Sequence, residues 1–178
     1  MADIEVPKDA KDSNERKVGV AIAVLAIVLA VVATLGTNQD NEKLAQEVSA
    51  ANGYAWYQSK RIRVALNEST LDELAIDEAG SPTPEQRAAM AALRTRLEAK
   101  NAEYKTENED ILKQADAAKA AAQAADDRGN RYDQAEVMLQ VSIVLCSITL
   151  LTGGRGFLLF GLLTAGGGIV AAVLAWFS

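Results

Sequence analysis

The sequence predicts an all-α membrane protein. Three transmembrane helices are expected to carry a long antiparallel helical hairpin, coiled-coil-like, that projects from the membrane. The 178-residue chain is 49% hydrophobic, yet its apolar residues are concentrated in blocks separated by strongly polar sequence. It has only three prolines and many helix-favouring Ala, Leu, Glu, Lys and Gln residues. Outside the apolar blocks, alternating Val, Ile and Thr runs, which are typical of strands, do not occur.

The apolar blocks divide the chain into five segments. The first block, residues 18–35, has no charge and is close to the length of helix that crosses a bilayer. A cleaved signal peptide is the alternative, but the block is long and its leader is rich in acids, which favours a retained helix. The expected segments are a leader at 1–17, transmembrane helix 1 at 18–36, an extramembrane hairpin at 37–136 with its turn at 80–83, and transmembrane helices 2 and 3 at 137–152 and 157–177.

Small residues recur at four-residue spacing in the first and last apolar blocks. This spacing places each pair on one face of a helix, and such faces let helices approach closely in lipid. In the first block, the abundance of alanine explains the pattern equally well. The candidate helix-packing residues are Gly19, Ala23, Ala26, Ala30, Gly161, Ala165, Gly168 and Ala172.

The first helix of the hairpin has apolar or small residues near the heptad spacing of a coiled coil. Gln58, Ser69 and Asp72 interrupt this series, whose members are Leu44, Val48, Ala51, Ala55, Ile62, Ala65 and Ile76.

The turn is the clearest local signal in the chain. Gly80 is expected to act as a C-cap glycine at the end of the first helix. Thr83 is expected to be the N-cap of the returning helix, with Pro84 at its first position. Gln86 lies three residues after Thr83, which is the spacing of a capping box.

The returning helix is expected to continue from Pro84 to about Thr152, because no proline interrupts it. Its three-four repeat predicts a coiled-coil seam. Four of the eleven seam positions are alanine, which buries little area, so the hairpin is expected to pack against copies of itself or a partner. The seam positions are Leu97, Asn101, Tyr104, Asn108, Ile111, Ala115, Ala118, Ala122, Ala125, Gly129 and Tyr132.

Aromatic and cationic side chains cluster in one short segment of the first hairpin helix. One interpretation is an interaction surface for a partner or a neighbouring copy. The other is that the aromatic rings fill the space left by small residues on the opposing helix. The candidate interaction residues are Tyr54, Trp56, Tyr57, Lys60, Arg61 and Arg63.

Composition argues against several function classes. The chain has a net charge of −6, which disfavours nucleic acid as a partner. It has no histidine and one cysteine, and we find no catalytic, cofactor-binding or metal-binding constellation. An enzyme is therefore not expected, and no cofactor is predicted. The expected partners are membrane lipid and further copies of the chain, with another membrane protein as the alternative.

Cations give the expected topology. Lys8, Lys11, Arg16 and Lys17 lie in the leader, and Arg155 lies in the link between the last two apolar blocks. With three spans these two segments fall on the same side, and the positive-inside rule places them in the cytoplasm. The hairpin and the C-terminus then face the periplasm or exterior.

The segments Asn41–Gln46 and Ser49–Arg63, together with the order of the parts, resemble a bacterial family known as domain-of-unknown-function family 4337. The resemblance covers most of the chain, with Ser59 at a position where alanine is expected. It implies an inner-membrane location and no activity. We therefore expect a structural or interaction protein that forms a homo-oligomeric assembly or scaffold with a periplasmic stalk. The alternatives are an accessory subunit of a larger membrane complex and, ranked lower, an oligomeric channel.

Overall fold

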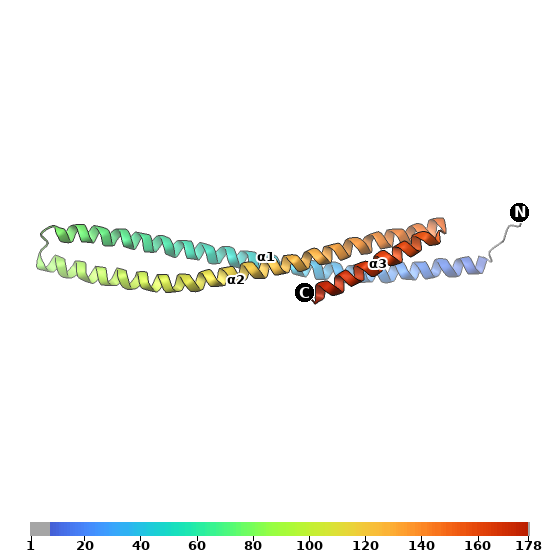
Figure 1. The fold of residues 1–178 in the computed structure, drawn as a ribbon, viewed down its shortest axis with the longest axis horizontal. Helices are drawn as coiled ribbons and strands as arrows, with labels where there is room; N and C mark the ends of the chain where they lie inside the picture. Colours follow the sequence, from blue (N-terminus) through green and yellow to red (C-terminus); the bar gives the residue numbers. More distant parts are fainter. Residues whose placement is uncertain (1–7, 178) are drawn as a thin grey trace. The chain divides into compact units, whose positions relative to one another are not determined.

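The computed structural model describes residues 8–177, and all regular structure among them is helical (Figure 1). α2 runs without a break from the turn through the polar sequence to the end of the second apolar block, which confirms the predicted continuity. α1 likewise joins the first apolar block to the polar sequence that follows it. The bounds are α1 Lys8–Ala79, α2 Pro84–Thr152 and α3 Arg155–Trp176.

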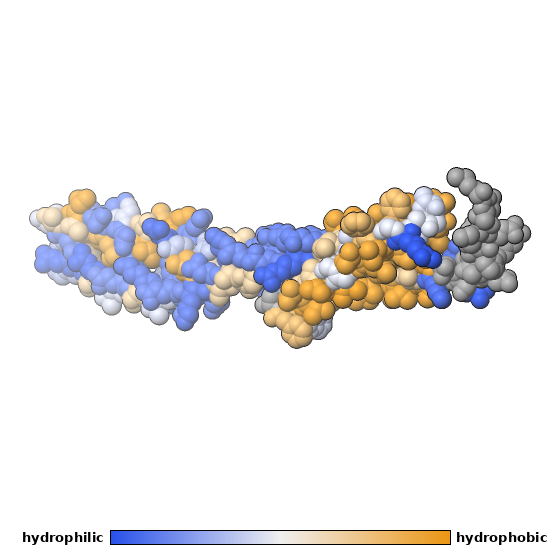
Figure 2. Space-filling model, turned by 45° about the vertical axis from the view of Figure 1, so that its right-hand side comes forward, coloured by the Kyte–Doolittle hydropathy of each residue, from blue (hydrophilic) through white to orange (hydrophobic). Residues whose placement is uncertain are grey.

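These residues divide into two compact units. Among the described residues, the first unit combines 8–43 with 123–177, and the second is Leu44–Ala122. Within the described residues, each of the three helices contains a stretch that is long and apolar enough to cross a membrane. Figure 2 shows that hydrophobic side chains cover most of the visible face of the first unit, whereas hydrophilic side chains dominate that of the second.

The turn between α1 and α2 contains the predicted capping box. The Gln86 backbone N–H donates to Thr83 Oγ1 at 3.3 Å, and the Thr83 N–H donates to Gln86 Oε1 at 2.8 Å. Gly80 directly follows the last residue of α1, as expected of a C-cap glycine, but its φ is not positive. Its N–H donates to the Asp77 carbonyl at 3.1 Å, so α1 ends in a 3₁₀-type hydrogen bond between residues three apart.

The link between α2 and α3 contains a glycine in the left-handed backbone conformation. Gly153 has φ 67°, and its N–H donates to the Thr149 carbonyl at 2.8 Å, the single bond of an αL helix cap. Gly154 is the N-cap of α3. Because the link needs only these two residues, α3 begins at Arg155 rather than at the expected residue 157, and it ends at Trp176.

The first unit packs around a core drawn from all three helices. Ser142, fully buried on α2, donates from its hydroxyl to the Gly161 carbonyl of α3 at 2.7 Å. This bond satisfies a polar group inside an apolar environment. The buried core residues are Val18, Leu25, Val32, Tyr132, Ala135, Leu139, Cys146, Ala165 and Ala175.

In the second unit, the α1 and α2 segments run antiparallel. Contacts pair Tyr54 with Asp116, Asn67 with Asn101, and Glu78 with Arg94, so residue numbers rise along α1 as they fall along α2. The predicted α2 positions from Leu97 to Ala122 are all buried or half-buried, and Ala125, Gly129 and Tyr132 of the first unit are buried.

Two asparagines are buried on this face of α2. Asn67 donates from Nδ2 to Asn101 Oδ1 at 2.8 Å, so this amide pair joins the two segments. Asn108 is also buried, but its Oδ1 has no hydrogen-bond partner among residues 8–177. Paired amides favour one register over others, because a shifted register would leave both unsatisfied.

Candidate interaction surface

The apolar series of α1 lies on the outside of the second unit. Leu44 is 60% exposed, Val48 53% and Ile62 61%, and the small residues of the series are exposed as well. We call the stretch of this series from residue 44 to residue 65, together with Gln58, the outer stripe. It comprises Leu44, Val48, Ala51, Ala55, Gln58, Ile62 and Ala65.

A different line of α1 faces α2. It is marked by Ala50, Gly53, Tyr57, Lys60 and Val64, all buried or half-buried and spaced by three and four residues. At about 100° per residue, this line lies roughly 150° around the helix from the outer stripe. The predicted heptad series therefore forms a continuous exposed stripe, and it is not the line of α1 that faces α2.

Steric fit explains this choice of face. A Cβ built on Gly53 would lie 2.8 Å from the Ala115 Cβ, which is closer than two carbons approach without repulsion. Gly53 therefore permits an approach of α1 to α2 that any larger residue would prevent. The outer stripe contains no glycine, so it offers no equally close contact to the alanine line of α2.

The structure divides the aromatic and cationic segment among three sides of α1. Tyr57 and Lys60 belong to the line that faces α2, while Trp56, Arg61 and Arg63 are exposed. Trp56 and Arg63 are seven residues apart and share one flank of the helix, and Tyr54 and Arg61 share the other. The six candidates are therefore not brought together on one surface.

Tyr54 reaches across to α2. Its hydroxyl donates to Asp116 Oδ1 at 2.6 Å. This hydrogen bond, together with burial and the charge of the carboxylate, raises the pKa of the Tyr54 phenol above 10.0, because all three favour the protonated form. Tyr54 is thus engaged within the chain.

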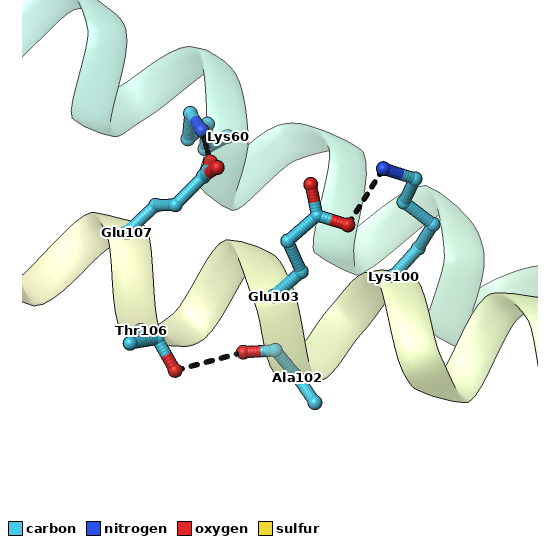
Figure 3. Close-up of polar contacts among 6 residues, drawn as sticks. All are labelled: Lys60, Lys100, Ala102, Glu103, Thr106 and Glu107. Atoms are coloured by element: carbon cyan, nitrogen blue, oxygen red, sulfur yellow. Dashed lines mark hydrogen bonds and ion pairs between the residues drawn. The ribbon is translucent and has the colours of Figure 1, made fainter.

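Lys60 is the most enclosed cation of the segment. Its side chain is 12% exposed and pairs with Glu107 of α2 (Figure 3). Its Nζ lies 5.2 Å from the centroid of the Tyr104 ring. Lys100 approaches the same ring at 5.7 Å and pairs with Glu103 at 2.6 Å. The hydrogen bond to Glu103 raises the pKa of Lys100 above its ordinary value.

Two grooves flank the helix pair of the second unit. One, of about 500 Å³, is lined by Trp56, Lys60 and Glu107 among others. The other, of about 420 Å³, includes Tyr57 and Arg61. Across the part of the chain that the structure describes, no group of three His, Cys, Asp or Glu side chains could hold a metal ion.

The two sets of small residues in the first unit have different surroundings. On α3, a Cβ at Gly161 would lie 2.9 Å from Cys146 Sγ, and one at Gly168 would lie 3.0 Å from the Ala135 carbonyl. These glycines therefore allow α3 to approach α2 within one chain. On α1, a Cβ at Gly19 would meet nothing within 4 Å, and Ala23, Ala26 and Ala30 are exposed as well.

The comparison with protein families agrees with the resemblance noted from the sequence. The profile of a family described as "Domain of unknown function (DUF4337)" matches residues 14–178. The chain belongs to this family. No curated protein and no solved structure matches the chain. Because the DUF4337 description assigns no activity, a functional proposal has to come from the contacts described above.

Proposed function

We propose that the protein is a membrane-anchored structural or interaction protein that assembles with copies of itself. In this proposal the first unit anchors the chain in the membrane, and the second unit is a helical hairpin that stands outside it as a scaffold or stalk. The three helices that are long and apolar enough to cross a membrane support the anchor. The hydrophilic surface of the second unit supports an aqueous location (Figure 2).

The proposed topology follows from the cations that flank the apolar helices. The leader and Arg155 lie in the cytoplasm of a bacterial inner membrane, and the second unit and the C-terminus face the periplasm. A cysteine introduced at exposed Ser59, in a Cys146→Ala background, tests this arrangement. A membrane-impermeant maleimide should label it once the outer membrane is opened, with the inner membrane intact. Labelling only after inner-membrane lysis would reverse the topology.

The observation that carries self-assembly is the outer stripe. Single exposed apolar residues are common on proteins, but this stripe repeats at the spacing of a helix-packing face. Complete burial of a Val, Leu or Ile side chain contributes about 1.5–3 kcal/mol, so burying the exposed part of each would add about 1 kcal/mol. Leu44, Val48 and Ile62 on two copies would together contribute about 6 kcal/mol.

This contribution is close to the cost of association, which is about 4–15 kcal/mol for two freely moving molecules. The outer stripe is therefore too weak to hold soluble copies together at low concentration. Anchoring in one membrane raises the effective concentration of the second units and lowers this cost. Self-assembly is thus expected of the full chain in a membrane rather than of the isolated hairpin.

The native mass of the full chain in a mild detergent tests the proposal. Light scattering with the detergent contribution subtracted should give a multiple of the 18.9 kDa chain mass. A Val48→Glu/Ile62→Glu variant should give a lower mass, and Ser49→Glu, at an exposed position off the stripe, should not. A monomer under all extraction conditions would refute self-assembly.

The second candidate is an accessory subunit of a larger membrane complex. Trp56 favours it, because this ring is 63% exposed and lines the larger groove. Aromatic side chains of this kind often anchor protein interfaces. A photoreactive amino acid at position 56 should then crosslink one foreign protein in cells. An oligomeric channel ranks lower, and ion flux in liposomes would separate it from a scaffold.

A further inference from the structure

The outer stripe has the form of a surface that receives another helix. Its seven positions alternate by three and four residues from Leu44 to Ala65, which is the repeat of knobs-into-holes packing. A loop or a flat protein surface would not require this period. The stripe also carries no ionised side chain, whereas the next positions of the series are Ser69 and then Asp72.

The residue at Gln58 indicates which helix fits. An amide is both a donor and an acceptor, so a Gln58 that faces Gln58 of a second copy can satisfy both. An aliphatic face on a foreign helix would leave the amide unpaired. Asp72 sets the end of such a contact, because the Asp72 carboxylates of two copies brought face to face would repel each other. A self-contact therefore begins near Leu44 and ends near Ala65.

The direction of the contact follows from the proposed anchoring. Copies that lie in one membrane with the same topology are related by an axis along the membrane normal, so their α1 helices run parallel. Equal stripe positions then lie at equal heights, and a two-fold axis brings each residue opposite its own copy. Resting on the proposed function, we infer that the outer stripe packs on the outer stripe of a second copy, parallel and in register.

Disulfide formation tests both whether a second copy packs on the outer stripe and whether the two stripes are in register. The chain has one cysteine, Cys146, which is buried in the first unit, so a Cys146→Ala background leaves no competing thiol. Val48→Cys, Ala55→Cys and Ile62→Cys would each be introduced alone into the full chain, and membranes would be oxidised before detergent is added. Ser49→Cys is the matched control, because it is exposed and adjacent to Val48 but lies on another side of α1.

In-register pairing predicts a disulfide-linked dimer for all three stripe cysteines. Each yield should exceed that of Ser49→Cys by roughly tenfold, because a disulfide needs Cα atoms within about 7 Å. A dimer confined to Ala55→Cys, near the middle of the stripe, would overturn the parallel direction in favour of an antiparallel one. No dimer at any stripe position would overturn the stripe-to-stripe contact.

The native mass distinguishes a failure of the stripe contact from a failure of self-assembly, which is the proposed function. A Cys146→Ala protein that is oligomeric by light scattering but forms no stripe disulfide would refute the stripe contact and leave self-assembly standing. The same protein as a monomer would refute both. A stripe cysteine that is linked to a different protein would replace the second copy with that partner.

Discussion

Gly53→Ala should destabilise the second unit, although alanine is ordinarily the better helix former. On an open helix face this substitution would stabilise by about 1 kcal/mol. Here the added Cβ would lie 2.8 Å from the Ala115 Cβ and 3.4 Å from its Cα. Overpacking of this kind costs about 1–3 kcal/mol. The expected net effect is a loss of about 1 kcal/mol in the free energy of unfolding.

A second substitution isolates the steric part of this loss. Ala115→Gly removes the methyl group that the new side chain would meet, and alone it should cost about 1 kcal/mol or more in helix propensity and lost burial. The double variant should be close to wild type, because the two positions exchange their side chains. The cycle therefore predicts a favourable coupling of about 1–3 kcal/mol between the two sites.

The assay is urea unfolding of the full chain in detergent, followed by the fluorescence of Trp56 in a Trp176→Phe background. Ala121→Gly, at an exposed position of α2, measures the propensity cost without the contact. If Gly53→Ala raised the unfolding midpoint and the coupling were zero, the close approach of α1 and α2 at Gly53 would be refuted.

Three further predictions concern single contacts. Asp116→Ala should bring the pKa of Tyr54 back toward 10.0 in a phenolate difference titration, and identical titrations of the variant and the wild type would exclude the hydrogen bond. Because this bond favours the neutral phenol, its stabilisation of the fold is complete below pH 10.0 and is lost as pH rises through the raised pKa. Gly161→Val should lower the thermal stability in detergent by about 1–3 kcal/mol, whereas Gly19→Val should have little effect, and equal effects would contradict the close α2–α3 contact. Thr83→Ala should cost about 1 kcal/mol in urea unfolding, and no loss would mean that the capping box does not stabilise α2.

The sequence was a good guide to α2 and a poor one to α1. On α2, the line that faces α1 coincides with the regular three-four series of alanine, asparagine and aromatic residues, so periodicity identifies it. On α1, the line that faces α2 includes Gly53 and Lys60, which a search for apolar residues does not select. The face was chosen by how closely Gly53 lets the helices approach, and by the pairing of Lys60 with Glu107.

Local chemistry was predictable at the turn but not at the glycines that end the helices. The capping box at Thr83 depends on residues three apart in sequence, so the sequence contains all of it. Gly80 and Gly153 both follow a helix, yet only Gly153 has a positive φ. The aromatic and cationic segment shows the same limit. Adjacency in sequence could not reveal that Tyr54 and Lys60 bond to α2 while Trp56 stays exposed.

Under the proposed membrane anchoring, the two-residue link at Gly153 bears on how the chain would enter a bilayer during synthesis. The apolar part of α2 is the least apolar of the three candidate spans, and it carries Ser142, whose hydroxyl would need an acceptor inside the lipid of the proposed anchor. The Gly161 carbonyl of α3 supplies that acceptor. With so short a link, α3 leaves the ribosome directly after α2. We therefore expect the two to insert together, and an α2 span truncated before α3 to be retained poorly by the membrane.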